Sequence, residues 1–212
     1  MSLTRPKSFC AGVAVLAAVW VWPLHSLAMP PFATHMVMHM AVVALAAPLL
    51  AFGIIGGPLD PVRRWPGACS AIVASALELL AVWAWHAPAL HHAARNELAA
   101  RALEQGTFLA AGLFLWVSAM GGGSELRRAR SLSGVAGLLL TSMHMTLLGA
   151  LIALTPRVLY AHHPSAGAVD PLLDQQLGGI IMLFWGALSY LVGGVALLCD
   201  ALLGASKRVE RS

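Results

Sequence analysis

Residues 35–55, HMVMHMAVVALAAPLLAFGII, contain no Asp, Glu, Lys or Arg. An apolar run of about 20 residues crosses the hydrocarbon core of a membrane as one helix, because a helix rises about 1.5 Å per residue. Pro48 lies inside the run and lacks an N–H, so we expect it to kink the helix or open a gap in its hydrogen bonding. The stretch therefore predicts a membrane-spanning helix that carries histidines and methionines at one end.

The rest of the chain repeats this pattern. Five further apolar runs lie at 9–27, 68–87, 101–120, 133–154 and 174–203. The 212 residues are 59% hydrophobic and 10% charged, whereas soluble domains carry roughly 25% charged residues. Gly179, Gly186 and Gly193 recur at heptad spacing, which predicts a close-packing helix face. The sequence therefore predicts an all-α, polytopic membrane bundle of about six transmembrane helices, with 1–212 as a single domain.

The basic residues predict the orientation of this bundle. Among the 13 Lys and Arg residues, only Arg95, Arg101 and Arg157 fall on the side opposite the termini if there are six spans. The positive-inside rule then places both termini in the cytoplasm. The net charge of +4 follows from this topology, and no basic stripe interleaved with aromatic residues indicates nucleic-acid binding.

The first apolar run has a second interpretation. Arg5-Pro6-Lys7, an apolar stretch and Ser26-Leu27-Ala28 also fit a cleaved signal peptide. Cleavage would leave five spans and would not change the side on which the remaining histidines lie.

All nine histidines fall on the outer side of the predicted topology. His35 and His39 are four residues apart, so they share a helix face and can bind one ion. His86 ends the third run, and His144 lies ~15 Å inside the fifth, by the helical rise. Ligand-type residues inside a membrane are costly, which makes them functional candidates. We interpret the others as ordinary polar residues near span ends or in loops: His25, His91, His92, His162 and His163.

Methionines accompany the strongest histidine candidates. Met36 and Met40 share a face rotated by about 100° from His35 and His39, so the whole group does not point at one ion. Methionine is also common packing material. Imidazole and thioether both bind copper, and thioether favours the reduced ion, so we predict a site for reduced copper. The candidate ligands are His35, His39, His86, His144, Met36, Met40 and Met143.

Further polar residues are candidates for a supporting role. Glu78 lies midway along the third run and Glu104 near the start of the fourth, where a carboxylate needs a proton or a partner. Each is either a counter-charge for a bound cation or a neutral packing residue. Asp174, Gln175 and Gln176 open the sixth run. Asp174 suits a helix N-cap, and all three are candidates to hold ligating histidines in place.

Several segments, taken in order, carry a family resemblance: His35-Met36-x-x-His39-Met40 with 46–50, 85–96, 147–160 and 174–182. Together they resemble the CtaG family of cytochrome c oxidase assembly proteins. The resemblance implies a multi-pass protein of the bacterial inner membrane that supplies copper to the oxidase catalytic subunit, with a periplasmic copper donor as a further partner. Family members commonly carry a histidine after the Leu-Glu of the fourth run, where this chain has Gln105, which does not replace it as a copper donor.

Two other functions remain open on the sequence. A membrane b-type cytochrome needs two axial histidines on facing helices, such as His39 and His144. A copper transporter needs a continuous polar route, and the cytoplasmic halves of the spans hold almost no polar ligands. We do not expect an enzyme, because the chain has neither a Ser-His-Asp arrangement nor an HExxH motif.

Overall fold

The computed structural model describes residues 4–21, 30–123, 126, 129–160 and 169–209, and all the secondary structure in these segments is helical. The elements are α1 (Thr4–Trp20), α2 (Pro31–Met40), the π-helical segment η2 (Ala41–Ala46), α3 (Ala47–Ile54), α4 (Pro61–Arg64), α5 (Ala71–Trp85), α6 (Pro88–Asn96), α7 (Leu98–Met120), α9 (Ser131–Leu154) and α10 (Pro171–Val209). The prediction of an all-helical chain is confirmed.

The number of membrane spans is lower than predicted when the described helices are judged by length and composition alone. Four segments are long and apolar enough to cross a membrane: Pro31–Ile54, Leu98–Met120, Ser131–Leu154 and Pro171–Leu203. The pair α5 and α6 makes a fifth span if a pair bent by 73° counts as one. The expected sixth span corresponds to α1, which has 17 residues, so the count of six is not confirmed.

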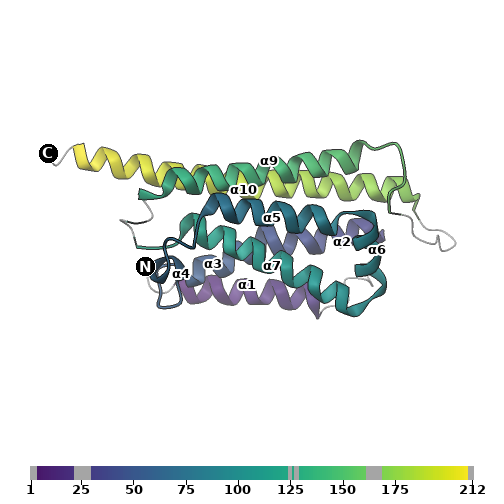
Figure 1. The fold of residues 1–212 in the computed structure, drawn as a ribbon, viewed down its shortest axis with the longest axis horizontal. Helices are drawn as coiled ribbons and strands as arrows, with labels where there is room; N and C mark the ends of the chain where they lie inside the picture. The colour runs from purple at the N-terminus through teal and green to yellow at the C-terminus, as the bar shows by residue number, and fades with distance from the viewer. Residues whose placement is uncertain (1–3, 22–29, 124–125, 127–128, 161–168, 210–212) are drawn as a thin grey trace.

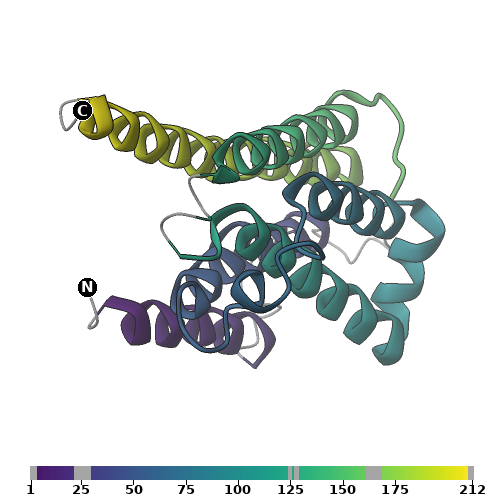
Figure 2. The ribbon, with the colours of Figure 1, turned by 60° about the vertical axis from the view of Figure 1, so that its left-hand side comes forward.

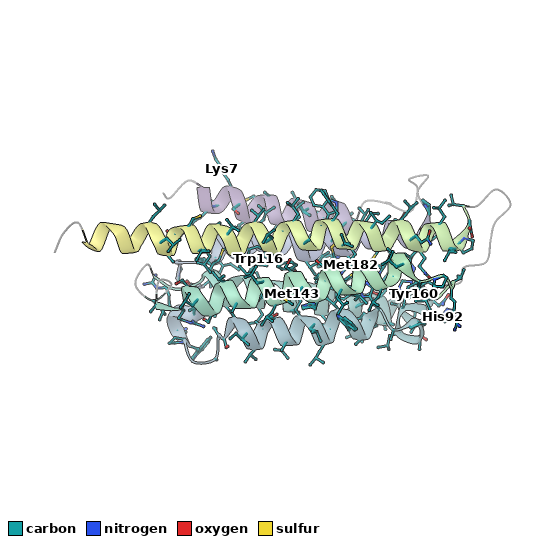
Figure 3. The ribbon with its side chains drawn as sticks, turned by 90° about the horizontal axis from the view of Figure 1, so that it is seen from above. Lys7, His92, Trp116, Met143, Tyr160 and Met182 are labelled. Carbon is teal, nitrogen blue, oxygen red and sulfur yellow. The ribbon has the colours of Figure 1, made fainter. Side chains whose placement is uncertain are left out.

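The long helices run roughly along one axis (Figure 1). Helices α9 and α10 pack side by side, while α1 lies on the opposite side of the bundle against α3 (Figures 1 and 2). Helix α1 begins and α10 ends toward the same end of the bundle (Figure 1). Lys7 lies toward that end, while Tyr160 and His92 lie at the other (Figure 3). We call these the α4 end and the α6 end, after the short helices found there.

The glycines of α10 form the predicted packing face. A Cβ on Gly179 would lie 2.5 Å from the backbone nitrogen of Ala153 in α9, and a Cβ on Gly186 would lie 2.9 Å from the Cβ of Met145. Gly193 meets the ring of Trp116 in the same way, at 2.5 Å. These distances are too short for any side chain, so the glycines allow α10 to approach α9 and α7 closely.

Pro48 opens the hydrogen bonding of the second predicted span, as expected. Because Pro48 has no N–H, the helix lacks one backbone donor to the carbonyls of the preceding turn, which includes Ala44. The hydroxyl of Ser189 in α10 donates to the Ala44 carbonyl at 2.8 Å. The helix widens into the π-helical segment η2 just before the proline. The span nevertheless continues from Pro31 to Ile54, four residues longer at its start than the predicted stretch.

Candidate metal centre

Four histidines from three helical segments meet inside the α6 end of the bundle. His35 and His39 lie on α2, His86 follows the last residue of α5, and His91 lies on α6; none is more than 3% exposed. The ring centroids of His39 and His86 are 5.2 Å apart, and those of His35 and His91 are 4.8 Å apart. The ring centroids of His35 and His86 are 6.3 Å apart, so the two pairs lie next to each other. We call these four residues the histidine cluster.

Glu104 of α7 adds a carboxylate to the cluster. Its Oε1 lies 3.6 Å from Nε2 of His35. The ligand atoms of His35, His91 and Glu104 all lie within 4.8 Å of one another. An ion with nitrogen and oxygen ligands at about 2.0–2.2 Å needs ligand separations of about 3.4 Å in tetrahedral geometry. Small side-chain rotations would therefore close this trio around an ion.

His86 is held in the orientation of a metal ligand. Its Nδ1 lies 2.6 Å from the carbonyl oxygen of Val82, which only accepts, so Nδ1 carries the proton and Nε2 keeps its lone pair. That buried Nε2 has no hydrogen-bond partner among the described residues. A backbone carbonyl on one ring nitrogen commonly orients the other toward a metal. The hydroxyl of Tyr160 fixes the residue further by donating to the His86 carbonyl at 2.6 Å.

His35 has a different electrostatic setting. The guanidinium of Arg95 lies 3.4 Å from its Nδ1, and since arginine only donates, this nitrogen is the acceptor. In the neutral ring the proton is therefore on Nε2, the atom that faces Glu104. An ion bound at Nε2 would need the other neutral tautomer, with the proton on Nδ1, and Arg95 would then have to turn away from that nitrogen. Glu104 also offsets positive charge that Arg95 places beside the cluster.

Asp174 holds the helix that carries two of the histidines. From the first turn of α10, its Oδ2 accepts from the backbone N–H of Phe32 at 2.9 Å and its Oδ1 from that of Ala33 at 2.8 Å. These N–H groups belong to the first turn of α2, which has no capping side chain of its own. Asp174 therefore caps α2, the neighbouring helix, and fixes the position of His35 and His39.

Gln175, the next residue on α10, anchors the segment that covers the cluster. Its side-chain oxygen accepts from the N–H of Leu159 at 2.6 Å, and its nitrogen donates to the carbonyl of Arg157 at 3.1 Å. This brings Tyr160 over the cluster, where its ring lies 4.4 Å from that of Phe32 and 4.7 Å from that of His91. Burial raises the pKa of Tyr160 to about 12, so its hydroxyl keeps its proton and remains a donor.

Other predicted site residues lie elsewhere in the fold. His144 on α9 is 6% exposed and makes no hydrogen bond or ring contact within the described part of the chain, so it pairs with neither His39 nor the rest of the cluster. Met143 is 68% exposed on the outer face of α9. Met36 packs beside Gly178 of α10, and Met40 lines an apolar groove between η2 and α10. Gln176 is half-buried and forms no hydrogen bond to the described residues.

The carboxylate of Glu78, on α5, lies deeper in the bundle than the histidine cluster, toward the α4 end. It is fully buried, and its Oε1 accepts from the hydroxyl of Tyr190 in α10 at 2.5 Å. Glu78 precedes His86 by eight residues, which places it about 12 Å deeper along the helix. Gln105 lies closer, because its side-chain amide donates to Glu104 at 3.3 Å. Glu78 therefore links α5 to α10 inside the bundle, while Gln105 contacts the cluster through Glu104.

His91 and Tyr160 are residues of the cluster and its cover that the sequence analysis did not single out. The interpretation of His91 as a loop residue is wrong, because Pro88 starts the helix α6, where its fixed φ is suited to the first position. On that helix His91 and Ala94 are buried while His92 is exposed. Their three-residue spacing is the helical signal that identifies His91. His25, His162 and His163 lie outside the described residues.

A family model described as "Cytochrome c oxidase caa3 assembly factor" (Caa3_CtaG) matches residues 1–202. Neither the curated proteins nor the solved structures contain a match. The matched range contains the whole histidine cluster, Glu104 and the residues that hold them.

Proposed function

The chain belongs to the family of cytochrome c oxidase caa3 assembly factors, and on this premise we propose that it binds copper at the histidine cluster and helps deliver it to the catalytic subunit of the oxidase. The observation that carries the proposal is the convergence of four buried imidazoles and one carboxylate at a single end of the bundle. In this role the protein holds and passes an ion, and we assign no catalytic step to it.

The chemistry of the donors supports copper as the cargo. Imidazole is a good ligand for copper, zinc, iron and nickel, and among these metals an assembly factor of a haem–copper oxidase has a use for copper. His39 and His86 supply two nitrogen donors, while Glu104 supplies a negative charge beside His35. Because Met36 packs beside Gly178, Met40 lines an apolar groove and Met143 is exposed, we propose a site of nitrogen and oxygen ligands.

The arrangement also suits transfer rather than storage. The cluster has two linked pairs of imidazoles instead of one closed set of four ligands around a point. An ion held by two or three donors keeps an open coordination position, where a ligand of the partner can bind before the first ligands leave. Delivery then proceeds by ligand exchange, without a free ion.

The proposal includes a topology. We take α1 as the sixth span and place both termini in the cytoplasm of a bacterium, because Arg63, Arg64 and Lys7 lie toward the α4 end and the positive-inside rule assigns such residues to that side. The α6 end then faces the periplasm, where a soluble copper donor has access to the cluster.

The test is the copper content of the full chain purified in detergent. We expect about one copper ion per chain and loss of that ion in the double variant His35→Ala, His39→Ala, which removes one imidazole from each pair. Two single variants serve as matched controls: His92→Ala removes an exposed imidazole next to His91, and His144→Ala removes a buried one on α9. Loading with reduced and with oxidised copper, in separate experiments, identifies the preferred oxidation state.

The same variants separate a local effect from loss of the fold. Both controls are expected to keep the ion, and helicity is expected to be equal in all variants. If the double variant retains the wild-type copper content, the histidine cluster is not the site. In a bacterium lacking the protein, oxidase activity should be restored by the two controls and not by the double variant.

A further inference from the structure

A second candidate site lies at the α4 end, far from the histidine cluster. An open cavity of about 700 Å³ is lined by Arg5 of α1, by Arg63 and Arg64 of α4, and by the turn that connects α3 to α4, residues 56–58 with Asp60. Two helices distant in the sequence thus bring three guanidinium groups to one hollow. We call it the arginine pocket.

The positive charge of this pocket is not balanced by its one carboxylate. Asp60 is 2% exposed, and its oxygens are directed to the backbone. Its Oδ2 accepts from the N–H groups of Gly56 and Gly122, both at 2.7 Å, and its Oδ1 from that of Val62 at 3.0 Å. Among the described residues no carboxylate forms an ion pair with any of the three arginines. The pocket therefore attracts an anion.

The turn at Gly56 holds two of the arginines in place. Gly56 has a φ of 71°, a conformation that glycine adopts at little cost. The guanidinium of Arg5 lies where a Cβ of residue 56 would be, so it rests directly on the bare backbone. Arg63 donates from Nη1 to the Gly56 carbonyl at 3.1 Å. Both groups are thus positioned before any ligand binds, which lowers the entropy cost of binding.

The surroundings place the pocket at the depth of lipid head groups. It lies between the last residue of one span, Ile54, and the start of α5. Beside it, the guanidinium of Arg64 lies 5.1 Å over the ring of Trp65, which is 58% exposed, and Leu59 is 78% exposed. Tryptophan is enriched where a membrane meets water, and exposed apolar side chains there suit contact with acyl chains.

We propose that the arginine pocket binds the phosphate group of an anionic phospholipid. Guanidinium groups bind phosphate through paired N–H donors, and basic pockets at the ends of membrane helices accept such head groups. The neighbouring apolar residues favour a lipid over a free anion. Bound lipid would join α1 to α4. The site is independent of copper, so either proposal can fail without the other.

The test is native mass spectrometry of the full chain, released from detergent with added phosphatidylglycerol or phosphatidylcholine. Phosphatidylglycerol is expected to stay bound and phosphatidylcholine to be lost. Arg5→Gln and Arg64→Gln are each expected to weaken binding of phosphatidylglycerol about five-fold. This is the effect of removing one basic residue near an anionic membrane surface. The guanidinium of Arg64 forms no hydrogen bond to the described residues, so Arg64→Gln carries the test if Arg5→Gln does not fold.

Lys7→Gln is the matched control, because it removes one positive charge toward the same end of the bundle and outside the pocket (Figure 3). Its expected effect is less than two-fold. An effect equal to that of Arg64→Gln would mean general attraction to a charged surface and would overturn the proposal, as would equal retention of the two lipids. Inorganic phosphate is added in a further arm. If it displaces the lipid at comparable concentration and with the same dependence on the arginines, the pocket takes free phosphate and the lipid assignment fails.

Discussion

Replacing Asp174 tests whether the position of α2 depends on a cap supplied by α10. In Asp174→Ala the N–H groups of Phe32 and Ala33 lose acceptors at 2.9 and 2.8 Å and remain buried. A hydrogen bond to a charged group contributes about 1.5–3 kcal/mol, and a lost N-cap costs about 0.5–2 kcal/mol. We expect Asp174→Ala to lower the free energy of unfolding by about 2–4 kcal/mol, between the sum of two such bonds and one ordinary cap.

The same change should weaken copper binding, because the capped turn precedes His35 and His39. Loss of a group that positions a ligand typically lowers metal affinity by about 10–100-fold. Thermal unfolding followed by circular dichroism and a copper competition titration measure the two effects. Asp170→Ala is the matched control, since within the described chain that carboxylate accepts from one backbone N–H, that of Leu172 in the first turn of α10, at 3.2 Å on an exposed surface. It removes an ordinary N-cap, so we expect a loss of about 1 kcal/mol and no change in copper affinity. If Asp174→Ala has the unfolding temperature and copper affinity of wild type, the cap does not position the site.

Three further changes test the packing and the cover of the cluster. Gly179→Leu should separate α10 from α9, where a Cβ already lies 2.5 Å from backbone, and should lower the unfolding temperature well below that of Leu177→Ala, a change on the exposed face of the same helix. Ser189→Ala removes the hydroxyl that donates to the Ala44 carbonyl and should cost about 1 kcal/mol, measured by thermal unfolding; an unchanged value would show that this hydrogen bond does not stabilise the fold. Because the folded pKa of Tyr160 is about 12 and an unperturbed tyrosine titrates near 10, the contribution of Tyr160 to stability should be constant below pH 10 and be lost between pH 10 and 12. Tyr160→Phe should reduce the alkaline loss of stability in unfolding curves measured from pH 8 to 11.5, and an equal loss in the variant would show that Tyr160 does not contribute to it.

Helices could be predicted from the sequence because length and hydropathy alone define a membrane span. The run 35–55 is long, apolar and free of charge. In a membrane its backbone groups must bond within the segment, so it forms a helix whichever helices pack against it. Its start was missed, since Pro31 begins the helix at the position where proline suits it. The opening at Pro48 also followed from covalent structure. That Ser189 of α10 compensates for it depends on which helices are neighbours, which local sequence does not contain.

Of the residues that meet at the α6 end, His35, His39, His86 and Glu104 were candidates on the sequence and His91 was not. The four-residue spacing of His35 and His39 places them on one face regardless of tertiary structure. Depth in the membrane made His144 a stronger candidate than His91, yet the structure joins His91 to the cluster through the 73° bend between α5 and α6. Pro88 marks the start of α6 in the sequence, but the angle of the bend depends on packing. The heptad glycines of α10 could be interpreted from the sequence because a close approach of two helices requires small residues at regular spacing.

The most direct test of the copper site is X-ray absorption spectroscopy at the copper edge of the metal-loaded full chain. The account predicts a first coordination shell of nitrogen and oxygen at about 2.0–2.2 Å, by analogy with other metal–imidazole and metal–carboxylate bonds, with the outer scattering of imidazole rings, and loss of that signal in His35→Ala, His39→Ala. A shell dominated by sulfur at about 2.3 Å, unchanged in the double variant, would place the ion with the methionines and contradict the proposed centre.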